Sequence, residues 1–326
     1  MRRETAPQAV SPVDLSVRPL AETDLDTADR IFRLAFGTFI GLPDPSAFMG
    51  DAGFVRTRWR ADPSAAFGAY VDGGLAGSNF ATRWGSVGFF GPLTIRPDVW
   101  NRGVGKKLME PIVAYFDAQG IRHAGLFTFP HSQKHIGLYQ RFGFWPRFLT
   151  AVMSKPVTRT ADAASSWTTF SAVPADERSA ILSACREVTD AIYEGLDVSP
   201  EIRSVADQRL GDTVLLQGGD RLAGLAVCHS GPGTEAGSGT CYIKFAAVRP
   251  GPTAREDFDR LLSACEEFAA DAGARRLAAG VSTARHEAYA RLLERGFRTD
   301  MQGVAMKRPN EAGYNRAGVY VLDDWR

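Results

Sequence analysis

Short apolar runs and amphipathic segments alternate along this chain, with glycine or proline at most of the junctions. Residues 93–95 have strand character, and Arg96-Pro97 ends this strand because proline lacks an N–H and disfavours helix at the residue before it. Over residues 104–116 apolar side chains recur at helical spacing, and another apolar run covers residues 124–129. The pattern therefore predicts a βαβ unit.

The segments on either side extend this unit to a whole domain. Residues 17–37 indicate a strand followed by a capped helix. Residues 65–84 indicate two strands joined at Asp72-Gly73-Gly74, which is a strong hairpin signal. A short helix that ends near Gly143 and a following strand complete the series. We therefore expect an α/β (α+β) domain over residues 15–154.

The junction between the first strand and the helix of the βαβ unit has the composition of a phosphate cradle. The first turn of a helix leaves N–H groups without partners, and the helix dipole adds positive charge there. Gly103 and Gly105 let the backbone approach an anion closely, and Arg102 with Lys106 adds full positive charge. A lone Gly-Xaa-Gly is a weak signal, so the surrounding βαβ pattern is what favours a diphosphate site.

Two motifs now identify a likeness. Residues 100–105, WNRGVG, and residues 138–144, LYQRFGF, resemble the coenzyme A loop and the following helix end of the GCN5-related N-acetyltransferase (GNAT) family. Trp100 stands where the family usually has Gln or Arg, and Ser132 and His135 stand where its second motif often has Asn and Ala. The resemblance implies a mixed, mainly antiparallel twisted sheet flanked by helices, and acetyl-CoA as co-substrate.

The resemblance also implies roles for individual residues. Tyr139 would donate a proton to the departing sulfur as a general acid, although a ring that only packs under its neighbours would look the same in the sequence. The backbone of the strand would hold the pantetheine arm and the thioester oxygen, and the loop would grip the diphosphate. These cofactor-binding positions are Leu93, Thr94, Ile95, Arg102, Gly103, Val104, Gly105 and Lys106.

No general base stands out in the sequence. His131 follows the second strand, where an exposed loop histidine is the more common finding. The apolar tail that ends the chain carries Asp323, Asp324 and Arg326, and we hypothesise that one of these two side chains or the α-carboxyl of Arg326 orients or deprotonates the amine. The aromatic-rich segment 36–60 is predicted to form one wall of an apolar acceptor pocket.

The second half of the chain repeats the order of the first in outline. Residues 212–230 indicate a hairpin, and residues 240–250 indicate a strand that again ends in Arg-Pro. Glu256 and Phe258 then stand at the offsets of the two loop glycines, and Leu292 stands at the offset of the tyrosine. We therefore expect no coenzyme A in this half and a structural or substrate-shaping role, unless the register is off by a few residues.

These observations predict two tandem GNAT-like domains, of which the first is catalytic. The predicted organisation is an unstructured N-terminus at residues 1–14, a catalytic domain at 15–154, a linker at 155–167, a degenerate domain at 168–309 and a C-terminal tail at 310–326.

Composition excludes several other classes of protein. The 38 Lys and Arg against 37 Asp and Glu give a formal charge of +1, so the chain lacks the basic field that nucleic acid binding requires. It has no run of about 20 apolar residues and no secretory leader, which predicts a cytoplasmic protein. The four cysteines show no metal-ligand spacing, so we expect no metal and small buried thiols; they are Cys185, Cys228, Cys241 and Cys265.

The sequence thus predicts an acetyl-CoA-dependent N-acetyltransferase that acts on the amine of a small molecule or peptide by direct attack on the thioester. The alternative is an acyl-CoA-binding sensor or regulatory module without turnover. Use of a longer acyl chain, and a monomeric or homodimeric state, stay open.

Overall fold

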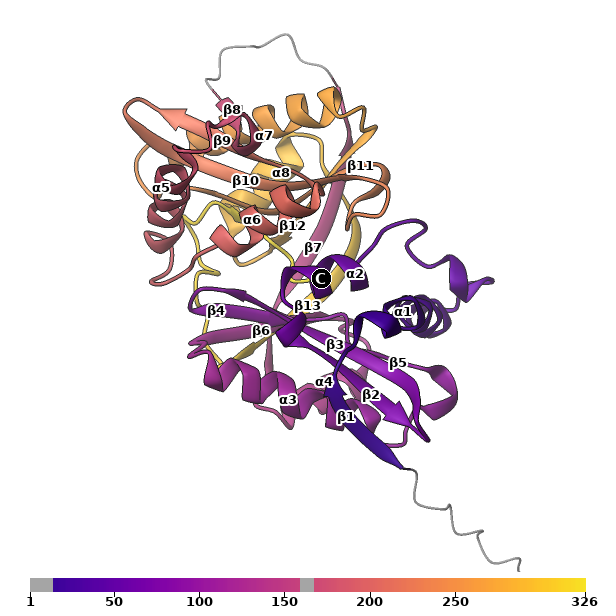
Figure 1. Ribbon diagram of the computed structural model, residues 1–326. Helices are drawn as coiled ribbons and strands as arrows, with labels where there is room; N and C mark the ends of the chain where they lie inside the picture. The colour runs from indigo at the N-terminus through magenta and orange to yellow at the C-terminus, as the bar shows by residue number, and fades with distance from the viewer. Residues whose placement is uncertain (1–13, 159–166) are drawn as a thin grey trace, which may run out of the picture.

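The computed structural model describes residues 14–158 and 167–326, and the remainder of the predicted N-terminus and linker lies outside the described residues. Two lobes are joined by long central strands (Figure 1). The first segment forms, in chain order, β1 (Leu15–Pro19), α1 (Leu25–Ile40), α2 (Val55–Ala61), β2 (Ala66–Val71), β3 (Gly74–Trp84), β4 (Val87–Phe90), β5 (Thr94–Ile95), α3 (Val104–Ala118), β6 (His123–Thr128), α4 (Gln133–Gln140) and β7 (Trp145–Pro156).

The second segment follows a similar order. Its elements are β8 (Trp167–Thr169), α5 (Arg178–Asp190), α6 (Ser199–Gln208), β9 (Gly211–Gly218), β10 (Arg221–Gly231), β11 (Gly237–Val248), α7 (Ala254–Asp271), β12 (Arg276–Ser282), α8 (His286–Glu294), β13 (Arg298–Arg308) and β14 (Val321–Leu322). Both predicted hairpins are confirmed, as the antiparallel pairs β2–β3 and β9–β10. At the first of them Asp72 and Gly73 both have positive φ, the conformation that a two-residue hairpin turn requires.

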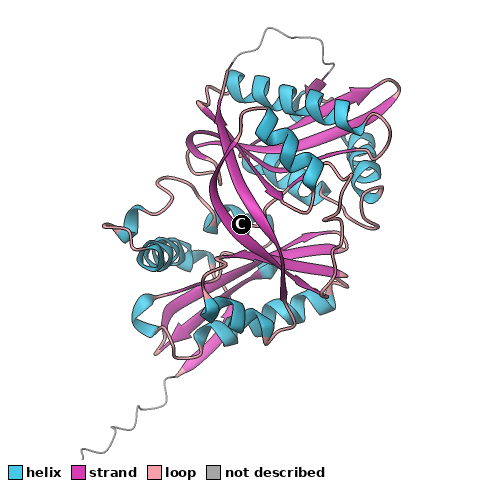
Figure 2. Cartoon of the chain, turned by 180° about the vertical axis from the view of Figure 1, so that it is seen from behind, coloured by secondary structure: helices cyan, strands magenta, loops and turns pink. Residues whose placement is uncertain are grey.

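All these strands join one mixed sheet of 14 strands. Its order is β1-β2-β3-β4-β6-β13-β7-β12-β11-β10-β9-β8, with β5 on β3 and β14 on β11. Strand β13 lies between β6 and β7, while β7 lies between β13 and β12, so each lobe is completed by a strand from the other segment. Figure 2 shows these two long strands crossing from lobe to lobe. The predicted ranges 15–154 and 168–309 therefore share strands, which the sequence pattern did not indicate.

The lobes also share a hydrophobic core. Trp84 and Phe89, from the first segment, are buried in the same cluster as side chains of α5, α6 and β10. The Trp84 ring lies 5.3 Å from that of Phe245 on β11. Because burying such aromatic surface is a main driving force of association, the first lobe is packed rigidly on the second.

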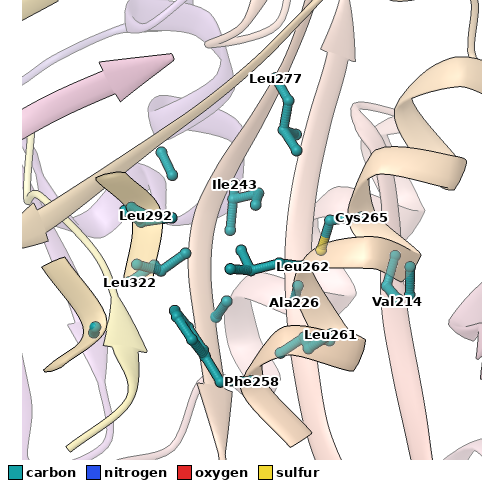
Figure 3. Packing of buried hydrophobic residues seen from close by; sticks show 14 of the residues in the cluster. Val214, Ala226, Ile243, Phe258, Leu261, Leu262, Cys265, Leu277, Leu292 and Leu322 are labelled. Atoms are coloured by element: carbon teal, nitrogen blue, oxygen red, sulfur yellow. The ribbon is translucent and has the colours of Figure 1, made fainter. Parts of the chain in front are cut away.

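A separate core fills the second lobe between its sheet and α7 (Figure 3). Phe258, Leu262 and Leu292 are buried there, together with Leu322 from the C-terminal tail. All four cysteines are buried and free of disulfides. Among the helices of the described residues, none has the length and apolar character needed to cross a bilayer.

Candidate active site

The first lobe opens where two parallel strands part. Strands β4 and β6 are paired from Val87 with His123 to Phe89 with Gly125. Strand β4 ends just before Gly91-Pro92, and the chain continues into β5, which pairs with β3. Beyond this point β4 and β6 no longer pair with each other. Two cavities lie at this opening.

The larger cavity is a groove of about 560 Å³ beside β5. Its walls come from α1, from the loop before α3 and from α4. Most of the predicted cofactor-binding residues line it, namely Leu93, Thr94, Ile95, Gly103, Val104, Gly105 and Lys106. Arg102 is exposed and is not among the lining residues, so the structure does not bring it together with the others.

The geometry of the loop explains why glycine stands at positions 103 and 105. Gly103 is the N-cap of α3 at φ +81°, a conformation that glycine adopts without steric cost. A Cβ on Gly105 would lie 3.0 Å from Ile95 Cδ1 and 3.3 Å from Leu138 Cδ2. Glycine therefore keeps the helix end close to β5 and α4 while leaving its first N–H groups accessible.

Trp100, which departs from the family pattern, holds this loop in place. Its indole Nε1 donates a hydrogen bond to the carbonyl oxygen of Ile95 at 2.7 Å. The Lys134 ammonium lies 5.5 Å from the centre of its ring, within the range of a cation–π contact. The tryptophan thus ties the loop both to β5 and to α4.

The groove is lined by cations on two sides. Lys106 lies at the start of α3, and Lys134 and Arg141 come from α4 and its end. None of the lining residues is acidic. The sequence analysis did not single out Lys134 or Arg141 as ligand-binding cations, although Arg141 lies within the LYQRFGF motif and Lys134 lies four residues before it. Cations around a helix N-terminus suit a phosphorylated ligand.

The smaller cavity has a volume of about 200 Å³ and lies against the groove. Phe36, Leu93 and His135 line both cavities, so the two meet at these side chains. Its remaining walls are mostly apolar: Phe32, Ile40, Phe48, Met49, Phe54, Phe90, Gly91, Pro92, Leu126, Phe127, Thr128, Phe129, Tyr139, Met301, Trp325 and Arg326. Segment 36–60 supplies Phe36, Ile40, Phe48, Met49 and Phe54 to this wall, while its role in binding an acceptor stays a prediction.

Two ionisable side chains of α4 line these cavities, His135 both of them and Tyr139 the smaller one. His135 and Tyr139 are four residues apart and so lie on one helix face. The Tyr139 hydroxyl is hydrogen-bonded to Thr128, and burial raises the pKa of the phenol. The ring also packs edge-on against Phe90, with centroids 5.6 Å apart. Packing and a proton-donating position are thus both compatible with this residue, and its acid role stays a prediction.

His135 is a candidate that sequence reasoning did not single out as a base. Burial lowers its pKa, and the positive charge of Lys134 and the neighbouring His131 lower it further. Its ring lies 4.9 Å from that of Phe39 on α1. A half-buried imidazole with a lowered pKa is neutral near pH 7 and can accept a proton.

The other predicted base candidates lie elsewhere. His131 is exposed and lines neither cavity. Asp323 accepts hydrogen bonds from Arg285 at 2.7 Å and from Tyr314 at 2.6 Å, while Asp324 accepts one from Tyr242 at 2.9 Å. These two carboxylates are buried, make these hydrogen bonds within the tail region, and do not line the smaller cavity. Their hypothesised role as base is therefore wrong.

The end of the tail does reach the site. Trp325 and Arg326 line the smaller cavity, and an α-carboxyl oxygen of Arg326 accepts a hydrogen bond from Arg58 on α2. The hypothesised role of this α-carboxyl toward the amine stays a prediction. Arg58 also donates to the carbonyl oxygen of Gly91 at 2.7 Å. One buried guanidinium therefore fixes both the tail and the break between β4 and β5.

Arg58 is in turn held by the second lobe. Glu235, in the turn between β10 and β11, pairs with its Nε at 2.8 Å and with Lys244 at 2.9 Å. Lys244 also pairs with Glu201 of α6 at 3.0 Å. Burial alone would raise the pKa of Glu235, but the charges of Arg58 and Lys244 lower it well below the usual range. Lys244 likewise overcomes burial and lowers the pKa of Glu201 to about 2.

The corresponding corner of the second lobe is built differently. Helix α7 begins at Ala254, four residues after Pro250, whereas α3 begins seven residues after Pro97. Counted from the helix start, the counterparts of the two loop glycines are Thr253 and Arg255. The predicted register, which placed Glu256 and Phe258 there, is therefore wrong by about one helical turn.

What fills this corner is the C-terminal tail. Strands β11 and β12 pair in parallel only from Thr240 with Arg276 to Ile243 with Ala279. Beyond that point β14 pairs with β11 at Ala246 and Ala247. Tyr320, just before β14, packs on Phe258 of α7 with ring centroids 5.2 Å apart. The chain itself thus occupies the opening that corresponds to the groove of the first lobe.

Helix α8 also lacks the two ionisable groups of α4. Ala288 and Leu292 stand at the same offsets from the helix start as His135 and Tyr139, and both are fully buried. The predicted equivalence of Leu292 with the tyrosine position is confirmed by this placement. Within residues 14–158 and 167–326, no cluster of three or more His, Cys, Asp or Glu side chains could hold a metal ion.

Comparisons with known proteins agree with this geometry. Residues 29–144 match the model of the acetyltransferase (GNAT) family, while no curated protein sequence matches the chain. A putative acetyltransferase from Pyrococcus horikoshii superposes with a TM-score of 0.66 at 13% identity, covering 98% of this chain and 97% of its own. A GCN5-related N-acetyltransferase from Sphaerobacter thermophilus gives a TM-score of 0.59 at 15% identity, covering 90% and 95%.

A third solved structure extends the likeness to a fungal protein. The glucosamine N-acetyltransferase region of a multi-domain β-N-acetylglucosaminidase gives a TM-score of 0.62 at 11% identity and covers 91% of this chain but 38% of the other. At such identities the likeness shows a shared fold. The chain therefore carries, at residues 29–144, a domain of the GNAT acetyltransferase family.

Proposed function

We propose that this protein is an acetyl-CoA-dependent N-acetyltransferase whose first lobe transfers an acetyl group to an amine. The observation that carries the proposal is the meeting of two cavities at one helix face. The groove beside β5 suits the coenzyme, the smaller cavity suits the acceptor, and His135 lines both. Domain boundaries near residues 154 and 168 belong to the same proposal.

The groove fits coenzyme A on three counts. Gly105 lets the start of α3 lie against Ile95 of β5, Lys106 and Arg141 add positive charge, and β5 lies beyond the point where β4 and β6 part. In this assignment the N–H groups of residues 103–106 hold the diphosphate, and the backbone of Leu93 to Ile95 holds the pantetheine arm. Arg102 then contributes only a distant charge. The coenzyme supplies a thioester whose carbonyl carbon is open to attack by an amine.

Two residues of the chain carry out the proton transfers. His135 takes a proton from the amine as the new C–N bond forms. Tyr139 gives a proton to the sulfur as the C–S bond breaks, and solvent restores both groups afterwards. Each proton transfer of this kind contributes roughly 100-fold or more to the rate.

The second lobe supports this site without binding coenzyme. Its Glu235 holds Arg58, and its own opening holds β14, which leads to Trp325 and Arg326 at the acceptor cavity. We assign it the structural and substrate-shaping role.

The test begins with the coenzyme. Titration calorimetry and thermal unfolding with acetyl-CoA should show one site per chain and a melting temperature that rises with the logarithm of ligand concentration. Thiol release measured with a panel of amines then tests for turnover. Absence of binding contradicts the whole proposal, whereas binding without thiol release for any amine supports an acyl-CoA sensor instead.

The pH profile tests the base. In the wild type, kcat/KM for the amine should fall below a pKa that is lower than the ordinary histidine value of 6.5, because the neutral imidazole is the active form. Lys134, His131 and Tyr139 are the other titratable groups near it. His135→Asn should lose that acidic limb and most of the rate. An unchanged profile would remove the residue from the mechanism.

A further inference from the structure

The smaller cavity has a chemical character that narrows the acceptor class. Its wall is a set of aromatic rings that support one another: Phe36 stacks on Phe48 at 5.2 Å, and Phe32 lies 5.4 Å from Phe48. Phe32 also lies 5.5 Å from Phe54. Met301 of β13 and Trp325 add apolar surface from the other segment. Such a wall favours an apolar group and fixes its shape.

The charged side chains beside this cavity are already paired with partners of opposite charge. None of the lining side chains is acidic, and the α-carboxyl of Arg326, which also lines the cavity, is held by the Arg58 guanidinium. Arg326 is paired with Asp324 at 2.9 Å, and its guanidinium lies 4.5 Å from the centre of the Tyr242 ring. Arg58 beyond it is paired with Glu235. A second ammonium group on an acceptor would therefore lose its water and find no counter-ion.

The size of the cavity limits how much of the acceptor it can enclose. Its volume is about 200 Å³. An apolar cavity of roughly 150 Å³ is known to accommodate benzene. One aromatic ring with a short alkyl arm therefore fills this space, whereas a disaccharide is too large to be enclosed in it. The ring would lie against Phe54 and Met301, which line only the smaller cavity, and the amine would lie at His135, which lines both.

We infer that the acceptor is a primary monoamine carried on a single apolar group about the size of one aromatic ring. This inference rests on the proposed acetyl transfer. It excludes polyamines and multiply charged sugars as good acceptors. The competing occupant of the same cavity is the acyl chain of a longer acyl-CoA.

Matched amines test the inference. With acetyl-CoA, kcat/KM for 2-phenylethylamine should exceed that for 1,4-diaminobutane by at least about 100-fold, because only the diamine brings an unpaired charge into the apolar wall. Equal values, or a preference for the diamine, would overturn the inference. The inference would also be overturned if hexanoyl-CoA reacted faster than acetyl-CoA and 2-phenylethylamine competed with it. That result would assign the cavity to the acyl chain.

A variant pair at an exposed part of the wall avoids the risk of misfolding. Met49 lines the cavity and is 37% exposed, so a polar residue is tolerated there. Met49→Glu should raise kcat/KM for 1,4-diaminobutane by about tenfold by supplying a counter-ion, while Met49→Gln should give no such gain. An equal gain in both variants contradicts the charge argument. Acetyl-CoA titration of each preparation shows separately whether the proposed function itself has failed.

Discussion

The two lobes of this molecule start from the same plan and end with opposite openings. In the first lobe β4 and β6 part beside a glycine loop, and the space is a cationic groove. In the second lobe β11 and β12 part in the same way, but β14 fills the space. The comparison teaches that the same parting of strands can leave a cavity or be filled by the chain itself, because parted strands have backbone groups that another strand can pair with.

The filled opening also gives the second lobe a role in the first. Once β14 is paired with β11, Asp323 and Asp324 anchor the following turn through Arg285 and Tyr242. The chain then brings Trp325 to the smaller cavity, the proposed acceptor site. We therefore regard the degenerate lobe as the support that sets one wall of the active site.

The largest effect is expected from closing the open lobe. Gly103→Glu places a carboxylate at the proposed diphosphate position and puts a residue with a side chain at a φ of +81°, which favours glycine. Acetyl-CoA affinity should fall at least about 1000-fold, because like charges in contact cost several kcal/mol. Thr253→Glu, the same change at the counterpart position, is the matched control. Calorimetry should show unchanged affinity in that control, and a similar loss in both variants would sink the comparison.

The next effect concerns the buried link between the lobes. Glu235→Gln leaves Arg58 partly unpaired and should lower the free energy of unfolding by about 3–5 kcal/mol. Glu194→Gln is the control, because its inter-lobe pair with Arg122 is exposed and should contribute about 0–1 kcal/mol. Urea unfolding measures both, and equal losses would contradict a special role for the buried pair.

The same link predicts a pH dependence. The pKa values of Glu201 and Glu235 are lowered in the folded state, so their contribution to stability is complete above the ordinary glutamate value of 4.5 and is lost as pH falls toward about 2. The Glu235→Gln variant should lose less stability over that interval than the wild type does.

A smaller effect is expected at the acid. Tyr139→Phe should lower kcat by about tenfold to 100-fold and leave the KM for acetyl-CoA nearly unchanged, because the hydroxyl acts only as sulfur departs. Tyr139→Leu, which imports the residue of the second lobe at position 292, should lower kcat further through lost packing against Phe90. Steady-state kinetics of both variants decide the point, and full activity in Tyr139→Phe would leave the ring with a packing role only.

The smallest effect, none at all, is expected from restoring glycines in the closed lobe. The double variant Thr253→Gly with Arg255→Gly should still bind one acetyl-CoA per chain, because β14 keeps its pairing with β11. A stoichiometry of two would show that the loop, and not the tail, closes this lobe.

The sequence predicted much of the local structure because each signal lies within a few residues. The hairpin at Asp72-Gly73 follows from residues that tolerate positive φ. The loop at Gly103 and Gly105 and the motif around Tyr139 likewise place side chains through the geometry of one turn or one helix. Local signals gave the wrong register at α7. This helix starts about one turn earlier, relative to the preceding Arg-Pro, than α3 does, and no feature of the composition marks the shift.

The sequence by itself determined the two hairpins, the place of the glycine loop and the helix that carries Tyr139. Only the tertiary structure decided that β7 and β13 change lobes, that His135 stands between two cavities and that the tail fills the second opening. Arg58 and Glu235 meet across 177 residues of chain. Such contacts depend on how whole elements pack, and burial and charge pairing between distant residues leave no periodic trace in the sequence.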